Sequence, residues 1–238
     1  MTDKITNFYE KLPKHLKKNT VDKSFKNHHF KNHHILPNSM ICAIGGTGTG
    51  KSNFVMNMIQ RMPNKFYKIM VFNPVSTDEP LLHLLKEKIP ETELINDINE
   101  LPSLADSDSD SDNEGDEEKL LIVDDFINMN KKDFKKVNEY FTGGRKKGYT
   151  VVALCQNYTS VPKVITRNCQ YFILFRLNDN TTLNNIIRNH NIHDVEKDLF
   201  KRFYDESTSD PLSFFMIDLK GKDKKTHLRK NFLDHHKI

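Results

Sequence analysis

Short apolar runs alternate with stretches of helical spacing along most of the chain. A short apolar run bounded by polar or turn residues is typical of a buried strand, whereas apolar residues three and four apart indicate one face of a helix. We therefore expect strands at residues 40–44, 67–72, 93–95, 119–123, 149–156, 171–175 and 212–218. We expect helices at residues 53–59, 81–86, 130–141, 181–190 and 195–204, and a short connection or helix at 162–168. This alternating order predicts an α/β fold with a mostly parallel sheet flanked by helices on both faces.

The connection between the first expected strand and the first expected helix has a sequence typical of phosphate binding. It fits the pattern G-x-x-x-x-G-K-[ST], and we assign to nucleotide binding Gly45, Gly46, Thr47, Gly48, Thr49, Gly50, Lys51, Ser52 and Asn53. Glycines let backbone N–H groups close around phosphate oxygens, and the helix start adds a partial positive charge. In such loops the lysine reaches the β- and γ-phosphates and the hydroxyl binds Mg²⁺. The alternative is a glycine-rich turn with an accidental lysine, which the flanking strand and helix disfavour.

Two later strands end in polar residues that complete this chemistry. Asp124 and Asp125 follow one apolar run, and Gln156 ends the next expected strand. In open α/β sheets, ligands bind at the carboxyl ends of the strands. We expect Asp124 to hold Mg²⁺ through water, as a Walker B acid does, and Asp125 to polarise the attacking water. The amide of Gln156 can contact the γ-phosphate or the water, and the alternative is a solvated strand end.

Composition sets limits on the class of protein. The chain has 238 residues, of which 37% are hydrophobic and 29% charged, which suits one sizeable α/β domain with a modest core. No apolar run is long enough to span a membrane, and the first residues lack the apolar core of a secretory signal. Cys42, Cys155 and Cys169 share no metal-ligand spacing, so we expect buried reduced thiols in an intracellular protein.

Charge is distributed unevenly and suggests the domain boundaries. Eight acidic residues and no basic ones lie between Asp106 and Glu118, so the rest of the chain carries +12 against a net +4 for the whole. Such a surplus suits a polyanionic partner such as nucleic acid, and the alternative is a solvated basic surface. We expect a basic N-terminal arm at 1–36, a phosphate-loop domain at 37–219 and a basic C-terminal tail at 220–238. Within the domain, residues 105–118 should form a disordered acidic insertion, because their charges repel and they cannot bury apolar surface.

The order of these motifs along the chain resembles the order found in one superfamily of motor proteins. Residues 144–175 hold its most specific part: Gly-Arg, a strand ending in Gln-Asn-Tyr, a Val-Pro-Lys-x-Ile-x-x-Asn turn, then Tyr-Phe-Ile-Leu-Phe. Together with the phosphate loop and the strand ending in Asp124-Asp125, this order resembles the FtsK/HerA superfamily of DNA-pumping ATPases. Within it, the chain is most similar to the genome-packaging ATPases of poxviruses, other large DNA viruses and virophages, over residues 36–191.

The resemblance implies a fold, cofactors and partners. The fold would be a RecA-like P-loop ATPase core of the additional-strand type, using ATP and Mg²⁺. The chain would assemble as a homo-oligomeric ring, often a hexamer, around double-stranded DNA, which it would bind without sequence preference. Capsid vertex proteins would be further partners, and no membrane would be involved.

The resemblance also implies roles for single residues. Lys51, Asp125, Gln156 and Arg145 would be catalytic, whereas Ser52 and Asp124 would hold the metal. Many members of the superfamily carry glutamate at the position of Asp125, so the shorter side chain here is a departure that affects how the water is reached. Arg145 matches an arginine just before the sensor strand and would act as a finger on a neighbouring subunit's γ-phosphate. The rival candidates are Arg167 and Arg176, and all three have an alternative as surface or DNA-contacting charges.

We therefore expect an ATP-driven double-stranded DNA translocase that packages a viral genome into a preformed capsid. It would work in the host-cell cytoplasm or viral factory and could be associated with virions. The nearest alternatives are a translocase or helicase of the same superfamily in plasmid transfer or replication, and a nucleotide-binding assembly factor without turnover. A nucleotide kinase of the phosphate-loop class is a further alternative, which the pair Asp124-Asp125 with Gln156 disfavours.

Overall fold

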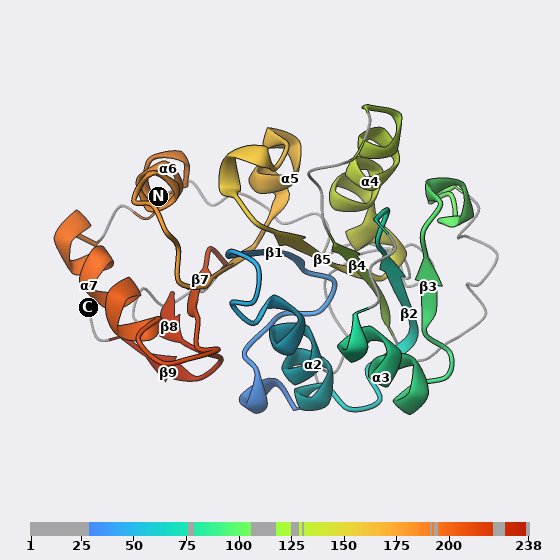
Figure 1. Ribbon diagram of the computed structural model, residues 1–238, viewed down its shortest axis with the longest axis horizontal. Coiled ribbons are helices and arrows are strands. Elements are labelled where there is room, and N and C mark those ends of the chain that lie inside the picture. The colour runs from blue at the N-terminus through green and yellow to red at the C-terminus, as the bar shows by residue number, and fades with distance from the viewer. Residues whose placement is uncertain are drawn as a thin grey trace, which may run out of the picture.

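The computed structural model describes residues 29–75, 79–105, 118–124, 129, 131–190, 192, 195–220 and 227–236, which form one sheet covered by helices on both faces (Figure 1). The strands are β1 (Met40–Ile44), β2 (Phe66–Phe72), β3 (Glu93–Ile95), β4 (Glu118–Asp124), β5 (Tyr149–Cys155), β6 (Tyr171–Leu174), β7 (Phe215–Asp218), β8 (Leu228–Lys230) and β9 (Asp234–His235). The helices are α2 (Lys51–Arg61), α3 (Pro80–Lys88), α4 (Lys131–Gly143), α5 (Lys163–Asn168), α6 (Thr181–Asn189) and α7 (Lys197–Ser207). The strands and helices expected between residues 40 and 218 are present at or near their expected residues, whereas a short amphipathic helix expected at residues 7–16 lies outside the described residues.

The strand order confirms the predicted fold class. Across the sheet the order is β3-β2-β4-β5-β1-β6-β7-β8-β9. Strands β1 to β6 pair in parallel, whereas β7, β8 and β9 add antiparallel strands at one side. Strand β5 lies between β1, which leads into the phosphate loop, and β4, which ends in Asp124. This intervening strand is the additional strand that the resemblance implies.

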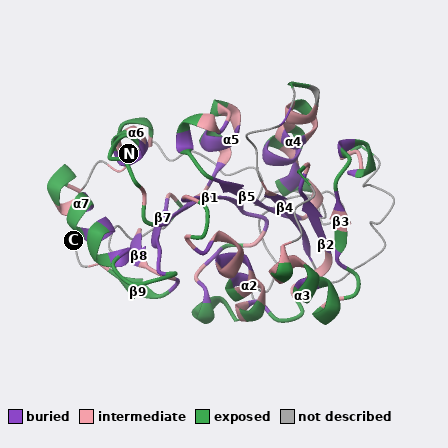
Figure 2. Cartoon of the chain, viewed as in Figure 1, coloured by how far each residue is buried: buried purple, intermediate pink, exposed green. Residues whose placement is uncertain are grey.

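The strands alternate their side chains between two apolar layers. Met40, Cys42 and Ile44 of β1 join the core under α4, α5, α6 and α7, whereas Ile41 and Ala43 join the core under α2 and α3. Figure 2 shows the consequence: the central strands are buried and the outer faces of the helices are exposed. A parallel sheet covered on both faces requires such nearly continuous apolar strands.

The last strands correct two of the expected boundaries. Residues 227–236 do not extend as a tail, because β8 pairs with β7 and β9 pairs with β8. Arg229 of β8 is only 1% exposed, and its guanidinium lies 3.4 Å from the Asp218 carboxylate and donates to the carbonyl oxygen of His34. The presumed N-terminal arm also ends inside the domain, since Ile35 is buried in the core under α2. An arginine in a short strand is expected to be exposed, but here the Asp218 carboxylate and the His34 carbonyl oxygen compensate for its burial.

The expected acidic insertion ends earlier than predicted. Residues 106–117 lie outside the described part of the chain, but Glu118 is the fully buried first residue of β4. Its Oε2 accepts hydrogen bonds from Asn38 N (3.1 Å) and Thr150 Oγ1 (2.9 Å), and Lys65 Nζ lies 3.3 Å from Oε1. Burial raises the pKa of Glu118 above its ordinary value, although Lys65 and the hydrogen bonds oppose this shift.

This carboxyl predicts a pH dependence of stability. The folded protein binds the Glu118 proton more tightly than the unfolded chain, whose carboxyl titrates near 4.5. The contribution of Glu118 to the free energy of unfolding is therefore greatest below pH 4.5 and falls as pH rises through the raised pKa, by about 1.4 kcal/mol per unit of difference. We expect urea unfolding between about pH 5 and pH 8 to show a steeper fall for the wild type than for Glu118→Gln. Equal pH slopes would contradict this prediction, and exposed Glu91→Gln is the matched control.

Two further expectations concern the thiols and membranes. Cys42, Cys155 and Cys169 are free and buried, as predicted, and burial raises the pKa of the Cys155 and Cys169 thiols. Among the helices of the described ranges, none combines the length and apolar character needed to cross a bilayer.

Candidate active site

The phosphate loop starts where β1 ends and stops where α2 begins. Gly45 N donates to the carbonyl oxygen of Cys155 at the end of β5 (3.0 Å), which anchors the loop to the neighbouring strand. Thr49 Oγ1 donates to Gly46 O (2.8 Å), a hydrogen bond that links two residues of the loop to each other. Phe54 N donates to Gly50 O (2.9 Å), the first hydrogen bond of α2. The first N–H groups of the helix remain directed toward the loop, where phosphate oxygens can accept from them.

Two glycines of the loop cannot carry a side chain. A Cβ on Gly45 would lie 2.6 Å from Thr49 Oγ1 and 2.7 Å from Phe175 Cβ, closer than real contacts allow. Gly50 has a φ of 108°, a left-handed conformation that disfavours other residues, and its face is crowded by Leu212 and Phe175. The sequence pattern identified these glycines, but nothing in it indicated that Phe175 and Leu212 would pack against them.

Lys51 lies inside the loop. Its Nζ donates to the carbonyl oxygens of Gly45 and Gly46, at 2.8 Å each. An ammonium held over the first residues of the loop is placed to neutralise the phosphate oxygens that such a loop surrounds. The side chain is half-buried, so this charge acts in surroundings less polar than water.

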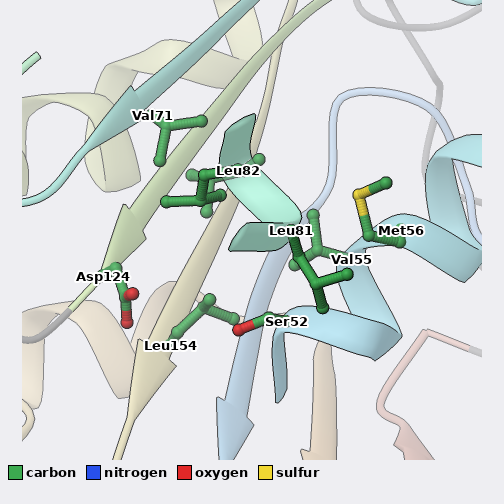
Figure 3. A pocket seen from close by; sticks show the side chains of 9 residues that line it. Ser52, Val55, Met56, Val71, Leu81, Leu82, Asp124 and Leu154 are labelled. Carbon is green, nitrogen blue, oxygen red and sulfur yellow. The ribbon is translucent and has the colours of Figure 1, made fainter. Parts of the chain in front are cut away.

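Ser52 and Asp124 line one small cavity, although two different elements carry them. The cavity has a volume of about 10 Å³, room for about one water molecule, and Ser52 is on α2 whereas Asp124 ends β4. In Figure 3, Leu154 of β5 lies between them, and the side chains of Val55, Leu81 and Leu82 form the apolar wall. A hydroxyl and a carboxylate are the oxygen ligands that Mg²⁺ prefers, so the donor set fits this ion.

The other residues expected at the site differ in exposure, and one of them is not described. Gln156 is exposed and directly follows β5, whose last residue Cys155 accepts the hydrogen bond from Gly45. Asn53 is half-buried in the first turn of α2, and Thr47 and Gly48 are exposed on the loop. Asp125 lies outside the described residues, so its role as the water-activating acid stays a prediction.

The three candidate arginines lie at opposite ends of the parallel strands. Arg145, in the short helix before β5, and Arg167, in the last turn of α5, line one pocket of about 400 Å³ together with Lys220, and none of the described residues that line it is acidic. Met40, the first residue of β1, lines it too, so the pocket lies at the opposite end of β1 from the phosphate loop. Four residue steps of a strand separate the two ends by about 13 Å. Arg176 instead follows β6 and Phe175, at the carboxyl ends of the strands, where the phosphate loop also lies.

Solved structures share the fold. The packaging NTPase B204 of Sulfolobus turreted icosahedral virus 2, in complex with AMPPCP, is similar with a TM-score of 0.56 and 12% identity over 85% of this chain and 99% of that chain. The EssC protein of Geobacillus thermodenitrificans, ATPases 2 and 3, has a TM-score of 0.53 and 12% identity over 83% of this chain and 40% of that one. The conjugation coupling protein TcpA of pCW3 has a TM-score of 0.53 and 14% identity over 83% and 62%. No curated protein sequence matches the chain.

Comparison with a family model identifies the family of the chain, whereas the solved structures show only its fold. The model of the family described as Poxvirus A32 protein matches residues 25–205, which span the phosphate loop, both strands with polar ends and all three candidate arginines. The match confirms the resemblance to poxvirus packaging ATPases, and the structural matches show that the chain shares its fold with B204 and EssC. The chain therefore belongs to the family of the poxvirus A32 protein.

Proposed function

We propose that the protein is an ATP-driven translocase that packages double-stranded viral DNA into a preformed capsid. One observation carries the proposal: in a chain of the poxvirus A32 family, Ser52 and Asp124 line the same cavity beside a complete phosphate loop. The similar B204 structure was solved with AMPPCP, an analogue of ATP, which supports ATP as the nucleotide of this fold.

The residues of the site would divide the chemistry of hydrolysis. Loop N–H groups and Lys51 would bind and neutralise the triphosphate, and Ser52 and Asp124 would hold Mg²⁺. The bound ion would neutralise charge on the β- and γ-phosphates. Gln156 would orient the attacking water at the end of β5, and Asp125 would accept its proton. Phosphoryl transfer needs mostly positioning and charge stabilisation, which fixed donors supply.

Arg145 would act on the nucleotide of a neighbouring subunit. Arg145 lies at the amino-terminal ends of the strands, out of reach of its own phosphate loop at their carboxyl ends, and this supports action in trans. Arg167 and Lys220 share its pocket, and they would help to attract the neighbour's triphosphate. Arg176 lies at the same end of the strands as its own phosphate loop, so it is the weaker candidate for an arginine finger that acts in trans.

DNA would be held by its backbone in the channel of a ring. A surplus of positive charge outside the acidic segment favours contact with phosphates without sequence preference. Lys146 and Lys163 are both exposed and flank β5 and α5, which makes them candidate contacts. Ring assembly, capsid vertex partners and a location in the host-cell cytoplasm or viral factory belong to the same proposal.

The test is ATP turnover with and without linear double-stranded DNA, at protein concentrations that favour rings. We expect DNA to stimulate turnover regardless of its sequence, and Asp125→Asn to bind ATP but to lose turnover. Displacement of a third strand from a triplex would show movement along the duplex. Nucleotide binding without turnover, with or without DNA, would favour the assembly-factor alternative, whereas turnover without strand displacement would contradict translocation.

A further inference from the structure

Leu212 has a conformation that leucine rarely adopts. Its φ is 64°, in the left-handed region, where the Cβ of an L-residue crowds the backbone. The side chain is also 55% exposed, the largest value among the exposed large apolar residues of the described chain. The left-handed conformation costs stability, and the exposed side chain gains little from burial in return, which raises the question of what the position does.

The surrounding contacts hold Leu212 firmly. Ser213 N and Oγ both donate to the carbonyl oxygen of Asp210, which closes a turn around Leu212. Phe214 packs edge-on against Phe54 of α2, with ring centroids 5.2 Å apart. Asn231 fixes Phe214 from the other side, since its Oδ1 accepts from Phe214 N (3.1 Å) and its own N donates to Phe214 O. The segment before β7 is thus fixed to the phosphate-loop helix.

The side chain of Leu212 lies on the phosphate loop. A Cβ on Gly50 would meet Leu212 Cδ2 at 3.0 Å and Leu212 Cα at 3.4 Å. Leu212 therefore approaches the last glycine of the loop, immediately before Lys51 and the start of α2. The part of its side chain that remains exposed forms an apolar surface beside the phosphate-binding residues.

The sheet order indicates which end of a nucleotide would meet this surface. Asp124, the metal-binding acid, ends β4, two strands from β1 on one side, whereas Leu212 precedes β7, two strands from β1 on the other. A metal ion held by Asp124 would neutralise the β- and γ-phosphates, so these phosphates would lie toward Asp124. The sugar and base, at the opposite end of the triphosphate, would then leave the loop toward Leu212.

We propose that Leu212 forms the apolar wall of a nucleoside subsite, which packs against the ribose and base of a bound nucleoside triphosphate. This inference rests on nucleotide binding by the phosphate loop, but it does not depend on DNA translocation. An apolar contact has no hydrogen-bond pattern that distinguishes bases, so ATP and GTP should gain from it equally.

The test compares ligands with and without a nucleoside. Leu212→Gly removes the side chain and keeps the left-handed conformation favourable, so its thermal unfolding temperature should not fall. We expect Leu212→Gly to weaken the binding of ATP roughly five- to tenfold by calorimetry, the loss of a partial apolar contact, and to leave the binding of inorganic tripolyphosphate unchanged. Leu212→Asn also tolerates a positive φ and should behave similarly, and exposed Leu233→Gly is the matched control.

The outcomes separate this inference from the proposed function. If the wild type binds ATP and Leu212→Gly binds it equally well, the nucleoside subsite is wrong and the proposed function stands. If Leu212→Gly weakens ATP and tripolyphosphate equally, Leu212 supports only the loop, and the subsite is again wrong. If the wild type binds no ATP, both the inference and the proposed function fail.

Discussion

Lys51→Ala is expected to abolish ATP hydrolysis, with a loss of at least about 10²–10³-fold in turnover. Lys51 Nζ is held over the loop by the carbonyl oxygens of Gly45 and Gly46, and it is the one loop side chain with a full positive charge. Without it, the charge that develops on the transferring phosphoryl group would lose the only cation that the phosphate loop itself supplies. The measurement is steady-state phosphate release at saturating ATP, together with calorimetric binding of ATP.

A lysine outside the site provides the control. Lys68 pairs with Glu93 at 3.0 Å on the rim of the sheet, and both side chains are partly exposed. Lys68→Ala should therefore keep wild-type turnover, since such surface pairs contribute little to stability. Retention of DNA-stimulated hydrolysis by Lys51→Ala would show that the phosphate loop is not the catalytic site.

Arg145→Ala is expected to lower turnover by about 10³–10⁵-fold, the contribution of an arginine finger, with little change in ATP affinity. The reason is positional: Arg145 lines a pocket at the amino-terminal end of β1, and its own phosphate loop lies at the other end. Arg167→Ala and Arg176→Ala, measured in parallel, identify the finger by the largest fall in turnover at unchanged affinity. Arg202→Ala, an exposed arginine of α7 that lies 3.8 Å from Glu206, is the matched control.

Mixing two inactive variants distinguishes action in trans from action in cis. In a one-to-one mixture of Arg145→Ala and Lys51→Ala, about a quarter of the ring interfaces would join an intact loop to a neighbour's intact arginine. Turnover should then reappear in the mixture, although each variant alone is inactive. A mixture that stays inactive while wild-type rings form normally would remove Arg145 from the role in trans.

The phosphate loop and the central strands could be predicted from sequence because their determinants are local. Glycines that must adopt a particular backbone, and apolar runs buried on both faces, leave a pattern in neighbouring residues. The order of β1, β5 and β4 came instead from the resemblance, because strand neighbours far apart in the chain leave no local signal. That Asp124 and Ser52 line one cavity follows from that order, since Asp124 ends β4 and α2, which carries Ser52, starts beyond the carboxyl end of the parallel strand β1.

What the sequence did not predict depends on contacts between distant residues. Arg229 and Glu118 look like exposed charges, yet Asp218 and Lys65 allow them to be buried at the start or middle of strands. The shared pocket of Arg145 and Arg167 also requires the fold, because the end of α5 and the start of β5 meet only in space. Leu212 gave no signal of its own, since an exposed leucine before a strand is ordinary in a sequence.

The outer strands of the sheet limit how copies of this chain can join. Within the described residues, the sheet ends in β3 with three residues on one side and β9 with two on the other. Unpaired backbone on a long, flat border would invite strand addition and aggregation between copies, whereas such short borders offer few hydrogen bonds. Short outer strands of this kind disfavour strand addition between copies, so contacts through helices and loops are the expected basis of an ordered assembly.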